Sequence, residues 1–405
     1  MKIKRVKYKD LEQVPLMKTN KVFKKDFFGS SPAPFIGRYG YPNVNIGFLS
    51  PQFSGDTSYY HSPRLWSKSD FAIGQVANFR SGLVNSRAKA SIKKAFDSKN
   101  KLLNICQEVG MAKRAVELEA NLNKVPNLQI KSEKEVIPFG PGAGVKFARI
   151  TENTKVDSRV ERVVSDTDLK SVKALISLYK KGFEEASLSK ILSVGNLGIG
   201  KNRKLVPTRW SITATDSTIG NSLVKEVKDL SVGDFEAYFG GGWGNYYLIL
   251  MFPEIYSYEL FETYLNSSVK LGADMNPWSK DGLMYSTDYE PYLGRKTYAE
   301  ETAGGFYTVR LALLEHMKKI KRQGSVLALR FITPEYNVPL GVWVTREASR
   351  KSLAAKPIRF ASKELMLKYA ELFVKKKFGF DVNLLTRESL LLKNMNEQAK
   401  LTQFV

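Results

Sequence analysis

Two hydrophobic patterns succeed one another along the chain, and their order limits the folds that it can adopt. Apolar side chains recur at helical spacing in residues 71–83, 102–122, 169–181, 301–321 and 363–377. The β-branched and aromatic composition of strands occurs in residues 145–150, 160–164, 236–239, 246–252 and 326–332. The segment before about Ser54 is rich in Gly and Pro and is expected to be irregular. Since no regular strand–helix–strand repeat appears, the order predicts an α+β fold of mixed helices and strands.

The length of the chain allows more than one domain. Its 405 residues, 43% of them hydrophobic and 25% charged, have the composition of a globular protein with a large core, so we expect two domains. Residues 272–294 are rich in Gly, Pro, Asp and Ser, and are the best candidate for a junction or a functional loop. From about Asp381 onward we expect a flexible C-terminal tail.

The charge balance indicates the class of partner. The sequence holds 63 Lys and Arg against 40 Asp and Glu, a formal net charge of +23. A surplus of this size attracts polyanions, of which nucleic acids are the commonest. Thermophilic proteins also carry many surface lysines, but they usually balance them with glutamates, which this chain does not do. The charge therefore favours DNA or another nucleic acid as the partner.

Few residues suited to metal binding are present. The single cysteine, Cys106, excludes a disulfide framework and any multi-cysteine zinc or iron–sulfur site. The sequence has two histidines, His61 and His316, so few residues are available for a histidine-based metal site or a Ser/His/Asp triad. No metal site is predicted. The first seven residues lack the apolar core of a signal peptide, and the longest apolar run, near residues 246–252, is too short to cross a bilayer. We expect a cytoplasmic protein with no membrane partner.

The last eight residues contain a short linear motif. Leu401 and Phe404 are three apart and would form one two-pronged apolar plug on a 3₁₀ turn, with the Gln398 amide on the same side and Val405 at the end. This is the pattern of a peptide that binds the PCNA sliding clamp. Alternatively, the apolar residues close an amphipathic helix that begins near Leu390. The polar residues 394–398 interrupt such a stripe, which favours the clamp-binding interpretation.

A glycine-rich basic loop lies in the middle of the chain. Residues 195–202 satisfy G-x-x-x-x-G-K, but Asn202 stands where a P-loop needs Ser or Thr, and a helix rather than a strand is expected before it. We interpret the segment as a basic loop in which Lys201, Arg203 and Lys204 bind nucleic-acid phosphates.

A second candidate site follows directly. Arg209 and Trp210 could clamp a phosphate or stack a base, and Asp216 could act as a base or bind a metal. Arg80 precedes Ser81 and Gly82, and Arg310 follows the Gly304–Gly305 pair. One hypothesis gathers these two arginines with Arg209 and Asp216 in a single site. The alternative is structural: Thr215 or Asp216 would cap a helix near Ile219, and Arg209 would form an ion pair.

The Gly304–Gly305 pair inside an expected helix indicates a close approach by another group. Each glycine costs on the order of 1 kcal/mol there. Either a ligand or, more commonly, a packing contact would explain the pair. His316 on the same helix is expected to be structural.

Four segments together resemble the archaeal Nre family of DNA repair proteins (NreA type). They are FIGRYGYPNV at 35–44, SGLVNSR at 81–87, KLVPTRWSITATD at 204–216 and ETAGGFY at 301–307. The resemblance spans nearly the whole chain and implies an N-terminal domain over 1–285, a C-terminal domain over 286–383 and a tail over 384–405.

The resemblance also implies a role in DNA repair together with PCNA, which the family engages through the terminal motif, here Gln398, Leu401, Phe404 and Val405. Some members carry a cysteine-pair zinc motif near the N-terminus. This chain has none, so a zinc-dependent DNA contact is not expected. The family supplies no agreed reaction, and the cofactor, if any, is unknown.

Three hypotheses follow. The first is a repair factor that binds DNA through its basic surface and is recruited by PCNA. The second is an enzyme that acts on nucleic acid or a nucleotide-like ligand at Arg80, Arg209, Asp216 and Arg310. The third is an RNA-binding factor whose terminal motif is accidental.

Overall fold

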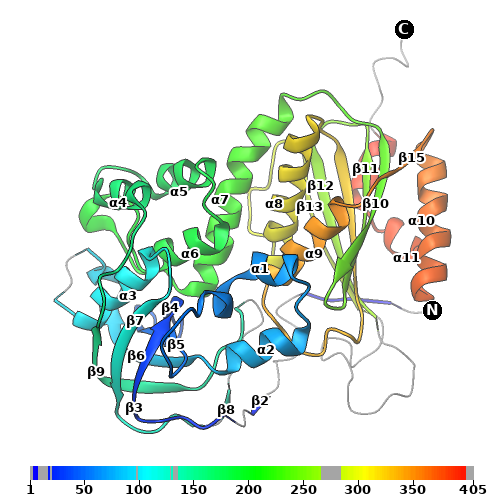
Figure 1. Ribbon diagram of the computed structural model, residues 1–405. Helices are drawn as coiled ribbons and strands as arrows, with labels where there is room; N and C mark the ends of the chain where they lie inside the picture. The colour runs from blue at the N-terminus through cyan, green and yellow to red at the C-terminus, as the bar shows by residue number, and fades with distance from the viewer. Residues whose placement is uncertain are drawn as a thin grey trace. The chain divides into compact units, whose positions relative to one another are not determined.

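The computed structural model describes residues 3–7, 17–18, 21–96, 99–127, 129–130, 136–265 and 284–397 (Figure 1). Contacts divide these residues into two units, each described here by itself. The barrel unit takes the described residues within Gln13–Ile219 and Val338–Trp343, and the sheet unit takes those within Met1–Glu12, Gly220–Asn337 and Val344–Val405.

The barrel unit is built on a sheet that closes on itself. Its strands are β3 (Asp26–Ser31), β4 (Ala33–Ile36), β5 (Asn43–Ser50), β6 (Val84–Ser91), β7 (Val116–Leu122) and β9 (Gly142–Ile150), in the order β3-β7-β9-β6-β5-β4. The two ends of this order, β3 and β4, are separated in sequence only by Pro32. They therefore act as one bent strand that pairs with β7 through its first half and with β5 through its second half.

The strand order and directions are those of the five-stranded Greek-key barrel known as the OB-fold. β6 and β9 are parallel, and every other pair in the barrel is antiparallel. Helix α3 (Lys101–Met111) connects β6 to β7, the third strand of the barrel to the fourth. Figure 1 shows these strands and α3 grouped together, in colours from blue (β3) to teal-green (β9). The face of the second and third strands, here β5 and β6, is where barrels of this kind often bind oligonucleotides.

Alternating side chains fill the barrel. In β7, Val116, Leu118, Ala120 and Leu122 are buried and alternate with partly exposed residues, the pattern of a strand with one face on the core. Helix α3 adds buried residues to the same core, and the Asn100 side chain caps it by accepting from the amides of Leu102 and Leu103 at 3.0 and 3.2 Å.

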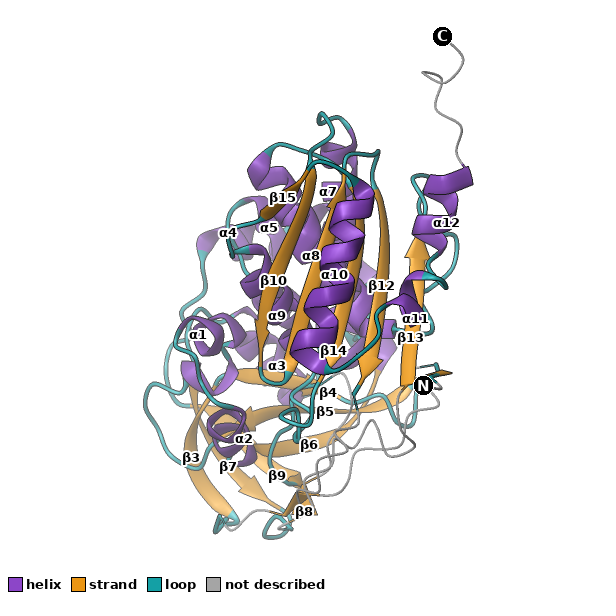
Figure 2. Ribbon diagram, turned by 90° about the vertical axis from the view of Figure 1, so that its right-hand side faces the viewer, coloured by secondary structure: helices purple, strands orange, loops and turns teal. Residues whose placement is uncertain are grey.

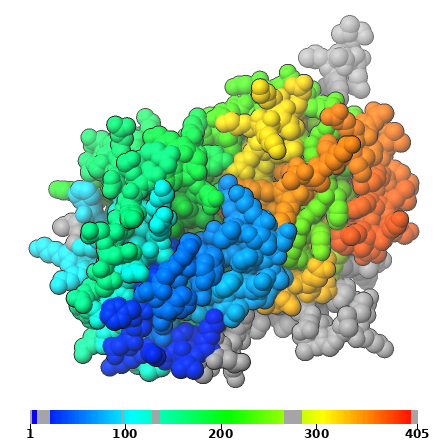
Figure 3. All heavy atoms as spheres, in the orientation of Figure 1, coloured from blue at the N-terminus to red at the C-terminus, as the bar shows by residue number. Residues whose placement is uncertain are grey.

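Several helices complete the barrel unit. Residues 51–83, between β5 and β6, form an insertion with η2 (Ser58–His61), α1 (Pro63–Lys68) and α2 (Ile73–Ser81), whose blue atoms form one continuous patch of surface in Figure 3. After β9 come α4 (Ser158–Ser165), α5 (Ser171–Lys180), α6 (Glu185–Ser193), η4 (Gly200–Asn202) and α7 (Thr208–Lys228), and the division between units falls inside α7. The short strands β2 (Met17–Lys18) and β8 (Gln129–Ile130) pair with each other.

The sheet unit is a mixed sheet with helices on both faces (Figure 2). Its strands, in spatial order, are β1 (Lys4–Arg5), β13 (Met284–Glu290), β12 (Ser257–Tyr264), β14 (Ser325–Ile332), β11 (Asn245–Phe252), β10 (Phe235–Gly242) and β15 (Ile358–Phe360). The helices are α8 (Ala303–Ile320), α9 (Trp343–Leu353), α10 (Lys363–Phe378), α11 (Asn383–Thr386) and α12 (Leu390–Glu397). An apolar core lies between one face and α10, α11 and α12, whereas α8 lies on the opposite face.

The α+β prediction is confirmed, but three expected elements are wrong. Residues 102–122 form α3 followed by β7, because the second half alternates with period two rather than at helical spacing. Residues 160–164 lie in α4, whose first turn is capped by Asp157 through the Arg159 amide at 2.9 Å. The segment before Ser54 holds β3, β4 and β5. The remaining expected helices and strands are present with shifted ends.

None of the helices in the described part of the chain combines the length and apolar character that crossing a lipid bilayer requires.

Candidate nucleic-acid interface

The outer face of β5 and β6 carries exposed cations. Alternate residues of β5, such as Ile46, belong to the barrel core, so Asn45 and Gly47 point outward. In the register of the two strands, Asn45 lies opposite Lys89 and Gly47 lies opposite Arg87. Both cationic residues are exposed, so this face attracts anions.

Glycines on adjoining segments leave room for these two side chains. A Cβ on Gly142 of the neighbouring strand β9 would lie 2.8 Å from the guanidinium carbon of Arg87, so the guanidinium lies across β9. A Cβ on Gly40, which has φ of +85°, would lie 3.2 Å from Lys89 Nζ. Lys89 therefore reaches the β4–β5 loop, which we define as residues 37–42.

Three aromatic side chains are exposed beside this face. Tyr39 and Tyr41 of the β4–β5 loop are 64% and 53% exposed, and Trp210 in the first turn of α7 is 46% exposed. The rings of Tyr41 and Trp210 lie 5.6 Å apart between centroids, and the guanidinium of Arg38 lies 4.6 Å from the centre of the Tyr39 ring. Exposed rings of this size are suited to stacking on bases.

A basic hollow adjoins the same strands. The lysine hollow has a volume of about 670 Å³, within the range of ligand pockets, and its lining includes Asn43, Lys89, Lys93, Lys94, Lys99 and Asn100. None of the described residues that line it is acidic. Four lysine side chains around one hollow give it a positive charge, which attracts phosphate groups.

Sequence reasoning did not identify this surface. Arg38, Tyr39 and Tyr41 were assigned to an irregular segment, and the lysine pair at 93 and 94 was not singled out. One signal was present in the sequence: Arg87 and Lys89 are two apart, the spacing of neighbours on one face of a strand.

The predicted phosphate-binding loop has a different geometry from a P-loop. Gly200 and Lys201 lie in the one-turn helix η4, and helix α6 precedes the loop. The Arg203 guanidinium is buried and donates to the carbonyls of Gly198, Val164 and Asp166 at 2.8, 2.7 and 3.1 Å. These contacts favour a structural role for Arg203.

Lys201 and Lys204 are exposed. Their predicted contact with nucleic acid stays a prediction.

Arg80 is 1% exposed inside the barrel unit. Its guanidinium donates to the carbonyls of Pro138 and Tyr60 at 2.7 and 3.2 Å and lies 3.1 Å from Nδ1 of His61. Burial lowers the pKa of Arg80 to about 9. Burial, together with Arg80 and Lys190, lowers the pKa of His61 well below its usual value. A charged Arg80 can therefore donate to a neutral His61 at pH 7, and these contacts favour a structural role for Arg80.

Arg209 and Asp216 lie in α7, on separate turns. Arg209 is partly buried in the first turn, next to the exposed Trp210, whereas Asp216 is 1% exposed in the interior of the helix. Asp216 and Thr215 therefore do not cap a helix near Ile219. The helix begins at Thr208, whose hydroxyl accepts a hydrogen bond from the Ile36 amide at 2.9 Å.

Arg310 belongs to the sheet unit. Its guanidinium forms a bidentate pair with Glu290 at 2.5 and 2.6 Å and donates to the Asn221 side chain at 2.9 Å. Tyr256 donates to the same carboxylate at 3.1 Å. Nearby carboxylate and tyrosine groups outweigh the desolvation of the guanidinium, so the pKa of Arg310 is raised. The enzyme hypothesis built on Arg80, Arg209, Asp216 and Arg310 stays a prediction.

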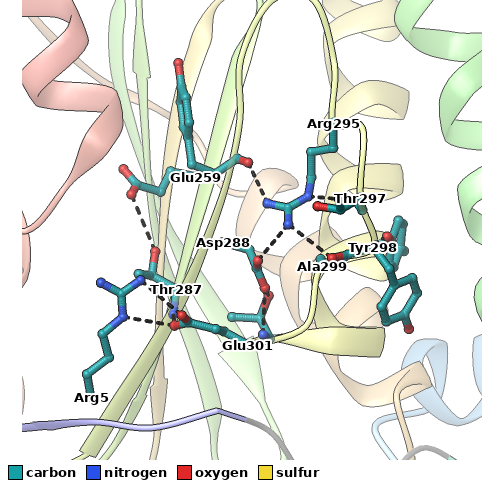
Figure 4. A network of polar contacts seen from close by, with 12 residues as sticks. Arg5, Glu259, Thr287, Asp288, Arg295, Thr297, Tyr298, Ala299 and Glu301 are labelled. Atoms are coloured by element: carbon teal, nitrogen blue, oxygen red, sulfur yellow. Dashed lines mark hydrogen bonds and ion pairs between the residues drawn. The ribbon is translucent and has the colours of Figure 1, made fainter.

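A polar network surrounds the end of β13 and the start of α8 (Figure 4). Asp288 accepts from the amide and hydroxyl of Thr302 at 2.8 and 2.9 Å and pairs with Arg295 at 3.0 Å. Glu301 pairs with Arg5 at 3.0 Å, which links β1 to the same region. These contacts fix the segment that leads into α8, so the charged groups of the network have a structural role.

Gly305 of the Gly304–Gly305 pair has a packing explanation. A Cβ on Gly305 would overlap Oε1 of Glu262, a buried carboxylate that is paired with Arg330. Arg330 also donates from Nε to the Asn245 side chain at 3.0 Å. The close approach is therefore that of a neighbouring side chain.

Among the described residues, no group of three or more His, Cys, Asp and Glu side chains is placed to hold a metal ion.

The terminal motif, Gln398, Leu401, Phe404 and Val405, lies outside the described residues. The helix before it is firmly attached to the sheet unit. Glu259 accepts from the Ser389 hydroxyl at 2.5 Å and from the amides of Leu390 and Leu391 at 3.1 and 3.0 Å. These bonds satisfy the first amides of α12, which ends at Glu397, one residue before the motif.

Comparisons with known proteins match both parts of the chain. The family model described as Archaeal Nre, N-terminal matches residues 8–270, and the model described as Archaeal Nre, C-terminal matches residues 290–404. The chain is 32% identical to DNA repair protein NreB of Archaeoglobus fulgidus over 97% of this chain and 95% of that protein. It is 35% identical to DNA repair protein NreA of Haloferax volcanii over 80% and 76%, and 33% identical to NreA of A. fulgidus over 87% and 86%. No solved structure matches the chain.

Proposed function

The chain belongs to the archaeal Nre family, and from this premise we propose that it is a DNA repair factor that binds DNA through its basic surface and is recruited by the PCNA sliding clamp. The observation that carries the proposal is the extent of the family match. It spans both parts of the chain, and relatives from two archaea are named DNA repair proteins.

The C-terminal motif supports recruitment by the clamp. The matched family region runs to residue 404 and so includes the motif residues Gln398, Leu401 and Phe404. A two-pronged apolar peptide at a chain end can dock into a hydrophobic pocket while its own domain keeps its structure. Because Glu259 holds α12 against the sheet unit, the peptide would follow an anchored helix.

The barrel unit supports DNA binding. Its exposed Arg87 and Lys89, the lysine hollow and the net charge of +23 all favour a polyanionic partner. Phosphate contacts of this kind are weak at physiological salt. A protein tethered to a clamp that encircles DNA gains a high local concentration of DNA, which makes the same contacts effective.

Isothermal titration calorimetry with purified archaeal PCNA tests the recruitment. The double variant Leu401→Ala, Phe404→Ala removes both prongs and is expected to abolish clamp binding. The matched control Thr402→Ala, Gln403→Ala changes the two intervening residues and should bind the clamp as the unaltered chain does. Equal clamp affinity for the unaltered chain and the prong variant would show that the motif is not the clamp ligand.

A further inference from the structure

We propose that the barrel unit holds a binding site for single-stranded DNA, formed by Tyr39, Tyr41 and Trp210 together with the lysine hollow. The inference deepens the proposed function, on which it rests, by assigning the DNA contact to one surface and one form of DNA. It follows from side chains on that surface, with the strand order of the barrel as the scaffold that presents them.

The charges of this surface select a nucleic acid over a protein. The described lining of the hollow offers four lysines and two asparagines and no carboxylate. Lys89, Lys93, Lys94 and Lys99 are exposed, so their ammonium groups remain available to an incoming anion. A chain of phosphates matches several ammonium groups at once, which a single small anion does not.

The aromatic residues select a single strand over a duplex. Tyr41 and Trp210 expose about half of their surfaces, and their rings lie 5.6 Å apart between centroids, so they form one aromatic platform. Bases in a duplex already stack on each other, whereas the faces of unpaired bases are open to protein rings. Arg38 lies against Tyr39 at 4.6 Å and adds a cationic group to the platform.

Lys89 connects the two halves of the site. Its ammonium group lies close to Gly40, which stands between Tyr39 and Tyr41, and the same residue lines the lysine hollow. Bases on the platform and phosphates in the hollow are thus neighbours. A single strand has this arrangement, with the phosphate backbone running beside its bases.

Hydrogen bonds from backbone amides hold the three contributing segments together. The Ile92 amide donates to the Pro42 carbonyl and the Leu205 amide donates to the Ile92 carbonyl, both at 3.0 Å. The Ile36 amide donates to the Thr208 hydroxyl at 2.9 Å. The β4–β5 loop, the segment after β6 and the start of α7 are therefore fixed before any ligand arrives, which lowers the entropy cost of binding.

Fluorescence anisotropy with a labelled oligothymidylate tests the inference on the full chain. The variant Tyr41→Ala, Trp210→Ala is expected to lose about tenfold or more in affinity for the oligothymidylate. The single variant Trp210→Phe should lose less, because it keeps a ring at this position. The control Phe28→Ala, Phe147→Ala removes two exposed rings from another part of the barrel, beside Asp26 and Glu119, and should bind as the unaltered chain does. Unaltered melting temperatures would show that all variants are folded.

Two further ligands decide the form of nucleic acid. A duplex of the same length should bind more weakly and be insensitive to the aromatic variant, and oligouridylate RNA should bind no better than oligothymidylate. Equal binding of oligothymidylate by the aromatic variant and the unaltered chain, or a preference for duplex or for RNA, would overturn the inference. The clamp variant Leu401→Ala, Phe404→Ala should bind oligothymidylate normally, so a failure of clamp recruitment and a failure of this site are distinguishable.

Discussion

The rings of Tyr41 and Trp210 lie 5.6 Å apart between centroids, although Tyr41 precedes β5 and Trp210 lies in the first turn of α7. The contact exists because the Thr208 hydroxyl accepts the Ile36 amide and so fixes the start of α7 to the end of β4. An exposed aromatic pair held in this way, next to the lysine hollow, is the feature of the barrel unit that most directly suggests a ligand. The adjoining lysine hollow gives the first prediction.

Lys93→Ala with Lys94→Ala should weaken oligothymidylate binding and reduce its dependence on salt. Each lost phosphate contact lowers the slope of log affinity against log salt by about 0.7 on a single strand, so the double variant should lower it by about 1.4. Anisotropy titrations between about 50 and 200 mM salt measure the slope. The matched control Lys375→Ala, Lys376→Ala removes two exposed lysines of the sheet unit and should leave the slope unchanged. Equal slopes for both variants would place the phosphate contacts elsewhere.

Gly305→Ala should destabilise the protein by about 2 kcal/mol or more, because the new methyl group overlaps the buried carboxylate of Glu262, which Arg330 holds in place. Gly74→Ala in α2 is the control. Nothing lies within 4 Å of a Cβ built there, so alanine should stabilise that helix by up to about 1 kcal/mol. Urea unfolding followed by circular dichroism measures both changes. A neutral effect at Gly305 would contradict the packing explanation of this glycine.

Arg310→Ala should cost about 3–5 kcal/mol of unfolding free energy, because it leaves the Glu290 carboxylate buried without its ion-pair partner. Arg310→Met combined with Glu290→Leu removes both charges and should lose much less. Chemical unfolding measures the free energy of unfolding of both variants. The difference between them gives the cost of leaving the Glu290 carboxylate buried without a partner, and the double variant alone gives the net contribution of the ion pair. If DNA binding fell in the more stable double variant, Arg310 would have a role beyond the fold.

His316 should make the protein less stable in acid. Burial is the main cause that lowers its pKa to about 4, with Glu236 opposing and Lys319 adding to the effect. The unfolded chain therefore takes up a proton near pH 6.5 that the folded protein resists until about pH 4. The unfolding free energy should fall as the pH drops through this window, by about 2 kcal/mol for this residue given its partial exposure.

Comparison of unfolding curves at pH 7 and pH 4 isolates that contribution. His316→Phe removes the titration and should lose less stability on acidification than the unaltered chain. Tyr238→Phe removes the hydroxyl that lies 3.1 Å from Nε2 of His316 but keeps the imidazole, so its acid sensitivity should remain. An identical pH dependence in all three proteins would show that His316 is not buried in its neutral form.

Helices and strands with a clean period were predictable from the sequence. Helix α10 has apolar residues at helical spacing and is capped by Gly379, whose φ of +63° suits glycine, and it was correctly expected. The barrel was not predicted. Its first strand is divided at Pro32, and the alternation of β7 follows directly on α3, so a single helical segment was expected there. Strand order depends on contacts between distant segments, which local patterns do not encode.

The candidate site was also predictable only in part. Trp210 was identified by its residue type as able to stack a base, but its partner Tyr41 belongs to a different segment and was not linked to it. Arg203 was predicted to hold phosphates, yet its guanidinium donates to three carbonyls of its own unit. Composition can show that a chain has more cationic than anionic residues. Only the fold shows which of them remain exposed.

Crosslinking shows whether the barrel unit binds the DNA. The full chain is irradiated with ultraviolet light in the presence of oligothymidylate, and the crosslinked peptides are identified by mass spectrometry. We expect crosslinks at Tyr41 and Trp210, in the peptides that carry the β4–β5 loop and the start of α7. Crosslinks confined to the sheet unit, with none at Tyr39, Tyr41 or Trp210, would contradict this expectation.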